Sequence, residues 1–407
     1  GMTFDSTNNK IVAAIGDFTD STGKVFVGTV SGTSISFGSG VTFNTGETAR
    51  PTATFDPDAG KVVIAFRDSG NSHYGTVITG TVSGTSISLD SETVYESARA
   101  EYNSIVYDSN ANKSLISYMD KGNSSYGTAI VAVISGTSVS FGSEVVFQST
   151  NSNPRSIVYD SGSSKIIIGY RKYDSWMRGF GVVGTVSGNS ISFGTPVRFD
   201  THNTSGYDIE YISLTYDSNA NKTLFTYRGN SSNGQISFGT VVTFHAANTQ
   251  EILSFYDPDA QLHGIAYEDV ANTPDFEYVT ATISGTSATI SSSTAISSNI
   301  GSNEKTMGAT YDTNANKGVL AYQILSPDSR GTARVIQNAS TTITRAEVAN
   351  SGKASMDIIG SVSDNQISLT AGQQYFVQTN GTISTTADSP SVLAGTAISA
   401  TELLVKT

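Results

Sequence analysis

Three arginines occupy the same position in separate copies of a repeated pattern, directly after an aromatic residue that ends a predicted strand. They are Arg67, Arg171 and Arg228, and a further copy has Glu268 at this position. The planar guanidinium of arginine donates two parallel hydrogen bonds to a carboxylate or a sulfate. If the copies surround one axis, these side chains converge and predict a binding site for an anionic glycan.

A structural role is the alternative for these arginines. Each arginine would then pair with an aspartate of a neighbouring copy, for instance Asp68, Asp120 or Asp269. Such an ion pair would hold two copies together and leave no guanidinium for a ligand. Both interpretations stay open at this point.

Sialidases also place three arginines on a propeller, so a sialidase-like glycoside hydrolase is a further alternative. That chemistry needs a tyrosine nucleophile with a glutamate beside it, and a second acidic group. No spacing links the available residues, which are Tyr102, Tyr207, Tyr211, Glu101 and Glu210. The S-x-D-x-G-x-T-W pattern of sialidase repeats is absent. We therefore expect that the chain is not an enzyme, and we assign no catalytic residue.

A long insertion in the fourth copy contains the single tryptophan of the chain, Trp176, with Tyr173 close to it. Sugar rings stack on aromatic faces, so these two residues are candidates for a glycan-binding platform. The alternative is that the inserted loop packs its own aromatic residues together.

No metal and no cofactor are expected. The hairpin sequences Asp56-Pro57-Asp58 and Asp257-Pro258-Asp259 contain paired carboxylates, but a calcium loop needs more oxygen ligands than they offer. Other copies replace the second aspartate with asparagine, which fits turn chemistry. The four histidines, His73, His202, His245 and His263, show no metal-binding spacing.

The repeat itself is marked by an aromatic-Asp dipeptide. It occurs at Phe4-Asp5, Phe55-Asp56, Tyr107-Asp108, Tyr159-Asp160, Tyr216-Asp217, Tyr256-Asp257 and Tyr311-Asp312. Within the copy from Pro51 to Tyr102, four apolar runs alternate with turn residues: Thr52–Phe55, Lys61–Phe66, Gly75–Val82 and Ile87–Tyr95. Four antiparallel strands per copy are typical of one propeller blade. The sequence predicts an all-β fold, a seven-bladed β-propeller over residues 2–350.

Two parts depart from the regular repeat. The fifth copy is short by about one strand, so its blade is expected to have three strands or to borrow one. Residues 351–407 leave the repeat and predict a small β module. A segment of this size is near the lower limit for independent folding, so we expect it to serve in attachment or to form a homo-oligomer.

Composition excludes several classes of partner. Lysine and arginine total 23 against 35 aspartates and glutamates, a net charge of −12, so no nucleic-acid partner is expected. No apolar run is long enough to span a membrane, so we expect no membrane insertion. The chain has no cysteine and therefore no disulfide.

The amino-acid sequence of the repeat resembles that of known proteins. The segments GTVSGTSISFG and TYDSNANK resemble repeats of structural proteins from marine bacteriophages, over nearly all of residues 2–350. The ending SLTAGQQYFVQTNGTISTTADSPSVLAGTAISATELLVK resembles a module near the C-terminus of phage tail-associated proteins. The resemblance implies a virion protein such as a tail fibre, with other virion proteins as partners and a host-surface glycan or receptor as target. A purely architectural virion part is the alternative, and no catalytic residue is implied.

Overall fold

The computed structural model describes most of the chain. The described residues are 1–17, 20–173, 177–200, 209–229, 232–237, 241–271, 275–285, 287–297, 306–324, 330–338, 362–363, 370–371, 373–377, 383–386, 392–397 and 403–405. The chain folds into two compact units, Gly1–Ala339 and Ser340–Thr407. The boundary expected at residues 350 and 351 lies outside the described residues.

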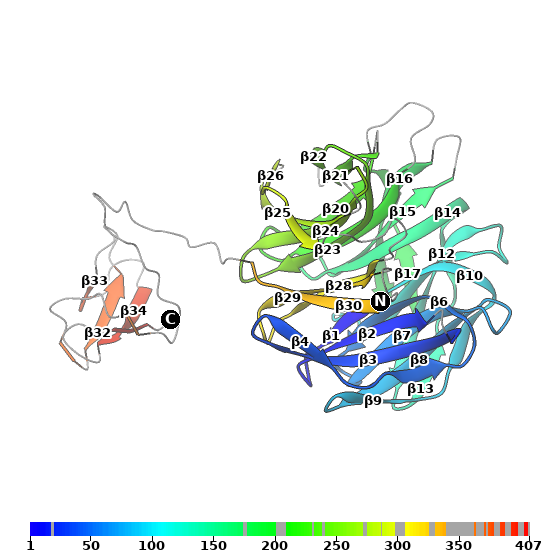
Figure 1. The fold of residues 1–407 in the computed structure, drawn as a ribbon, viewed down its shortest axis with the longest axis horizontal. Helices are drawn as coiled ribbons and strands as arrows, with labels where there is room; N and C mark the ends of the chain where they lie inside the picture. The colour runs from blue at the N-terminus through cyan, green and yellow to red at the C-terminus, as the bar shows by residue number, and fades with distance from the viewer. Residues whose placement is uncertain are drawn as a thin grey trace. The chain divides into compact units, whose positions relative to one another are not determined.

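A ring of innermost strands organises the first unit. These strands are β1 (Met2–Asp5), β6 (Thr48–Asp56), β10 (Thr93–Asp108), β14 (Val145–Asp160), β19 (Glu210–Asp217), β23 (Thr249–Asp257) and β28 (Thr306–Asp312). Each contacts the next one along the chain, and β28 contacts β1, which closes the ring (Figure 1). Every strand pair is antiparallel, and the described residues contain no α-helix. The prediction of an all-β propeller is confirmed.

Further strands extend outward from each innermost strand. In the first four repeats they are β2 (Lys10–Asp17), β3 (Thr22–Ser31), β4 (Ser34–Phe37), β5 (Val41–Asn44), β7 (Lys61–Asp68), β8 (Tyr74–Ser83), β9 (Ser86–Leu89), β11 (Lys113–Asp120), β12 (Tyr126–Ser135), β13 (Ser138–Phe141), β15 (Lys165–Lys172), β16 (Arg178–Ser187), β17 (Ser190–Phe193) and β18 (Val197–Arg198). In the remaining repeats they are β20 (Lys222–Arg228), β21 (Gly234–Ser237), β22 (Val242–His245), β24 (Leu262–Asp269), β25 (Asp275–Ser284), β26 (Ser287–Ile290), β27 (Thr294–Ser297), β29 (Lys317–Ile324) and β30 (Arg330–Ile336).

The outer edge of a repeat differs from the expected single fourth strand. The run expected from Ile87 to Tyr95 is divided between β9 and the start of β10, and both segments pair with β8. Strand β10 then continues inward and pairs with β11 of the next repeat. Strand β14 does the same one repeat later, so three repeats share one continuous sheet.

The fifth repeat has four strands, ordered β19-β20-β21-β22. Strand β21 is only four residues long and pairs directly with β22. In the first four repeats and in the sixth, the third strand is ten residues long and also pairs with a short strand that follows an SGTS-type turn. The deletion in the sequence therefore removed the outer hairpin, which is the outer end of the third strand and the short strand that pairs with it, and four strands of the fifth repeat remain.

The aspartate of each aromatic-Asp dipeptide stabilises the hairpin that follows it. The Asp108 carboxylate accepts backbone hydrogen bonds from Asn110 and Ala111, both at 2.9 Å. Four residues after the aspartate the backbone is left-handed in every repeat, at Asn9, Gly60, Asn112, Ser164, Asn221, Gln261 and Asn316. Glycine adopts this conformation without steric cost, and asparagine tolerates it. These hairpins all lie at one end of the ring.

Paired aromatic rings fill the core between neighbouring repeats. The aromatic residue two positions before the end of the second strand packs against an aromatic of the preceding repeat, as Tyr118 does on Tyr95 with ring centroids 5.2 Å apart. Phe43 and Phe66 form the corresponding pair one repeat earlier, at 5.1 Å. Where the ring closes, Met2 and Ile11 pack against Val319 and Ala321. Side-chain packing therefore joins the first and last repeats.

The second compact unit has its own sheet. Its strands are β31 (Val362–Ser363), β32 (Gln374–Val377), β33 (Ile383–Ser384), β34 (Val392–Ala397) and β35 (Leu403–Val405), in the order β31-β35-β34-β32-β33. Across both units, the described residues contain no long apolar helix that would cross a membrane.

Candidate functional site

A β-bulge near the start of the innermost strands re-aims side chains at the end of the ring opposite the hairpins. The register with the second strand shifts at this point in β6, β10, β19 and β23. The bulge residues Arg50, Tyr102, Tyr211 and Glu251 have φ angles of 52°, 56°, 49° and 44°. Each lies six residues before the hairpin aspartate. A left-handed conformation is costly for such residues and is concentrated at functional sites in proteins.

Tyr102 lies between arginines from the two neighbouring repeats. The guanidinium carbon of Arg50, on β6, is 4.5 Å from the centroid of the Tyr102 ring. The guanidinium carbon of Arg155, at the bulge of β14, is 4.4 Å from the same centroid. Both contacts are within the range of a cation–π interaction. We call Arg50, Tyr102 and Arg155 the Tyr102 cluster.

The two arginines of the Tyr102 cluster form no ion pair with any carboxylate of the described residues. Arg50 is exposed and Arg155 is half-buried. The buried Nε of Arg155 has no hydrogen-bond partner in the described part of the chain. Burial lowers the pKa of Arg155, and the positive charges of Arg171 and Arg50 lower it further. An unpaired guanidinium in such surroundings is stabilised by an anion.

The three arginines predicted from the repeat are paired with glutamates of the described chain. Arg67 lies 3.2 Å from Glu101 of the next repeat, and Arg171 lies 2.9 Å from Glu210 of the next repeat. Arg228 forms an ion pair with the other oxygen of Glu210. The pairing between repeats resembles the structural alternative, but its partners are glutamates at the innermost strands rather than aspartates.

Arg171 contacts both the ring and the hydroxyl of Tyr173. Only 5% of Arg171 is exposed, its guanidinium carbon is 4.5 Å from the centroid of the Tyr173 ring, and it donates a hydrogen bond to the Tyr173 hydroxyl. Asn153 donates to the same hydroxyl at 2.8 Å. Tyr173 is thereby held beside the arginines. Trp176 lies outside the described residues.

Glu268 and Tyr211 occupy the acidic side of the same end of the ring. Glu268 is 3% exposed and faces Gln250 in the strand register. The guanidinium carbon of Arg228 lies 5.1 Å from the centroid of the Tyr211 ring. Burial raises the pKa of Tyr211, and the charges of Glu251 and Glu210 raise it further. Glutamates therefore outnumber arginines in the surroundings of Tyr211.

Reasoning from the sequence named Tyr102 but missed both arginines that flank it. The prediction compared the copies at the residue after the second-strand aromatic, and it did not compare them at the start of the innermost strand. A signal was present in the alignment of the copies: Arg50 and Arg155 stand six and five residues before their hairpin aspartates. What the sequence could not show is that both side chains turn toward one ring.

The comparisons with known proteins identify the fold. No family model matches the chain, and no curated protein matches it. Among solved structures, the periplasmic gluconolactonase PpgL of Pseudomonas aeruginosa is similar, with a TM-score of 0.54 and 10% identity, covering 73% of this chain and 85% of that one. The BP39L lectin of Burkholderia pseudomallei has a TM-score of 0.53 at 10% identity, covering 81% and 95%. An α-L-arabinanase of Penicillium chrysogenum is matched at 0.48 and 11%, covering 71% and 93%.

These similarities correct one expectation. The chain was expected not to be an enzyme, yet one of the solved structures that it resembles, the gluconolactonase, is an enzyme. At about 10% identity the likeness shows the propeller fold alone. The fold is thus one on which both an enzyme and a lectin are built, and it gives no ground for excluding catalysis.

Proposed function

We propose that the protein binds an acidic carbohydrate at the Tyr102 cluster. One observation carries the proposal: two guanidiniums from neighbouring repeats flank Tyr102 without a carboxylate partner among the described residues. The three arginines first expected to bind the ligand are engaged by Glu101 and Glu210. Arg67 and Arg171 hold neighbouring repeats together, and all three arginines shape the surroundings of the cluster.

The chemistry of the cluster favours a sulfated or carboxylated sugar. A guanidinium binds an oxyanion through two parallel hydrogen bonds, and an aromatic ring beside it offers a surface for a sugar ring. The carboxylates of Glu101 and Glu210 nearby repel anions that are not aligned with the arginines. The similarity in fold to a lectin supports carbohydrate recognition as the class of function.

Binding to defined saccharides tests the proposal. We would titrate the protein with heparin-type sulfated oligosaccharides, uronic acid oligomers and neutral oligomers of matched length, using calorimetry. We expect the acidic ligands to bind, with an affinity that falls as salt rises. Arg155→Gln and Arg50→Gln should each weaken binding at least tenfold. Lys113→Gln is the matched control, since it removes one positive charge at the hairpin end of the ring.

Equal binding by Arg155→Gln and the parent protein would refute the assignment of the site. Equal binding of acidic and neutral oligomers would refute the assignment of the ligand class. An unchanged circular dichroism spectrum of each variant serves as the check that the fold is retained.

Hydrolysis of an acidic glycoside is the second candidate function. Tyr211 favours it, because this residue lies beside Arg228 and among the charges of Glu210 and Glu251. A tyrosine nucleophile needs such a glutamate to take its proton, since burial raises the pKa of the phenol. Release of reducing ends from the same acidic oligomers, lost in Tyr211→Phe, would establish this activity. If the oligomers bind but no reducing ends are released, the protein recognises the ligand and does not hydrolyse it.

We further propose the setting in which this binding takes place. The resemblance to marine phage proteins supports a virion component that recognises a host-surface glycan, in the form of a seven-bladed propeller with a C-terminal module for attachment or oligomerisation. The ring of innermost strands supports the count of seven. Many copies on one particle would strengthen weak binding. A purely architectural part is the alternative, and it predicts that Arg155→Gln leaves host attachment unchanged.

A further inference from the structure

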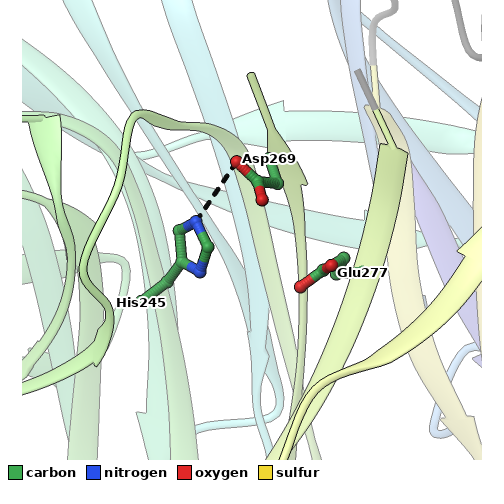
Figure 2. A group of neighbouring side chains, drawn as sticks. All are labelled: His245, Asp269 and Glu277. Atoms are coloured by element: carbon green, nitrogen blue, oxygen red, sulfur yellow. Dashed lines mark ion pairs between the residues drawn. The ribbon is translucent and has the colours of Figure 1, made fainter. Parts of the chain in front are cut away.

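Three side chains with metal-binding chemistry meet between the fifth and sixth repeats. His245 ends β22, Asp269 ends β24, and Glu277 lies on β25. One ligand atom of each lies within 4.8 Å of the other two. The Nε2 atom of His245 is 3.3 Å from Oδ1 of Asp269, and Figure 2 shows Glu277 beside this pair. Asp269 is 1% exposed.

The hydroxyl of Tyr267 sets the orientation of two of these groups. It donates its proton to Oε2 of Glu277 at 2.7 Å and lies 3.4 Å from Nδ1 of His245. Because a hydroxyl has one proton, its oxygen is left to accept from an Nδ1–H group. In neutral imidazole only one nitrogen carries a proton, so Nε2 then presents a lone pair.

That lone pair points toward a carboxylate. Nε2 of His245 is buried and has no hydrogen-bond partner among the described residues. A nitrogen lone pair 3.3 Å from a carboxylate oxygen is repulsive unless a cation lies between them. A proton on Nε2, in the other neutral tautomer or in the doubly protonated ring, or a metal ion meets this need, and only the metal ion also draws on Glu277.

We propose that His245, Asp269 and Glu277 bind a zinc ion. Zinc takes one imidazole nitrogen and carboxylate oxygens in four-coordinate sites, and three protein ligands leave one position for water. Tyr267 would act as the outer partner that orients His245 and Glu277. The ion would join β22 of one sheet to β24 and β25 of the next.

A related group in another repeat provides the matched comparison. Glu96, Asp120 and Glu144 also bring three ligand atoms within 4.8 Å of one another. Glu96 and Asp120 stand at the repeat positions of His245 and Asp269. This group offers oxygen ligands alone, which suit calcium better than zinc. Its loss should leave zinc binding unchanged.

The test is zinc titration of full-length protein that has been dialysed against a chelator. We expect calorimetry to show one high-affinity zinc ion per chain and the thermal midpoint to rise on zinc addition. His245→Ala and Glu277→Gln should abolish this binding, and Tyr267→Phe should weaken it ten- to hundredfold. Glu96→Gln is the control and should bind as the parent does.

Three results would overturn the proposal. They are no zinc binding by the parent protein, binding that survives His245→Ala, and binding lost equally in Glu96→Gln. If His245→Ala is unstable, Glu277→Gln decides, because a glutamine in that place still accepts the Tyr267 hydrogen bond. The visible absorption of cobalt bound in place of zinc gives a second readout, because its intensity is high when the coordination number is low. This absorption should be lost in His245→Ala.

Discussion

Replacement of Glu96 by glutamine should stabilise the protein at alkaline pH and leave it unchanged in acid. Glu96 is 8% exposed on β10, close to Asp120, which is 4% exposed. Burial, together with the charges of Asp120 and Glu144, raises the pKa of Glu96 from 4.5 to about 7, against the opposing hydrogen bond from Ala98. Between pH 4.5 and about 7, Glu96 is therefore protonated in the folded protein and ionised in the unfolded chain.

The sign and size of the effect follow from this difference. Between the unfolded and folded pKa values the native state binds more protons, so stability falls as pH rises through this window. At pH 8 the shift corresponds to a cost on the order of 3 kcal/mol. Below pH 4.5 the carboxyl is protonated in both states and the cost vanishes.

A neighbouring repeat shows that glutamine fits this position. Gln148 stands where Glu96 stands one repeat earlier, and its amide oxygen accepts a hydrogen bond from Tyr170 at 2.9 Å. Glu96 accepts the equivalent bond from Tyr118 at 3.4 Å. Glu96→Gln should thus keep the hydrogen bond and lose the charge.

Urea denaturation at pH 4, 6 and 8, in the presence of a chelator, measures the effect. We expect the variant to gain up to about 3 kcal/mol over the parent at pH 8 and nothing at pH 4. Glu47→Gln, which changes an exposed glutamate, is the control and should show no trend. A gain that is the same at every pH, or a loss at pH 8, would refute the reasoning.

Four further predictions concern stability. Arg155→Gln should raise the thermal midpoint while it weakens ligand binding, because it removes an unpaired, partly buried charge; a lower midpoint would assign Arg155 a structural role. Gln261→Gly should stabilise by about 1 kcal/mol in urea, because Gln261 has a φ of 52°, and Gly60→Ala should destabilise by a similar amount. In the Glu96→Gln protein, which lacks the opposing effect of Glu96, the thermal midpoint should fall between pH 7 and pH 5, because burial lowers the pKa of His263 below its usual 6.5 and the unfolded chain takes up the proton first; adding His263→Gln should make this fall smaller. The protein should also lose stability as the pH falls from 4 toward 2. Hydrogen bonds from His263 and from Ala220 lower the pKa of Asp217 to about 2, so the unfolded chain takes up a proton before the folded protein does.

The local rules of one repeat could be read from the sequence. The aromatic-Asp dipeptides located the hairpins, because an aspartate that accepts the backbone hydrogen bonds of its own turn acts within a few residues. The alternating apolar runs located the strands, and the aromatic at the end of the second strand located a buried core position, as at Tyr118. All of these depend on short stretches of chain, so a regular repeat displays them several times over.

Contacts between repeats were decided by the tertiary structure alone. The sequence placed Arg171 just after the end of its strand, whereas β15 includes it, and it could not show that Glu210 of the next repeat would engage it. It listed Tyr102 without showing that Arg50 and Arg155 would reach the same ring from both sides. These contacts depend on the twist between neighbouring sheets and on bulges that turn a side chain toward a new partner. Both are properties of strands packed together, and no single stretch of sequence contains them.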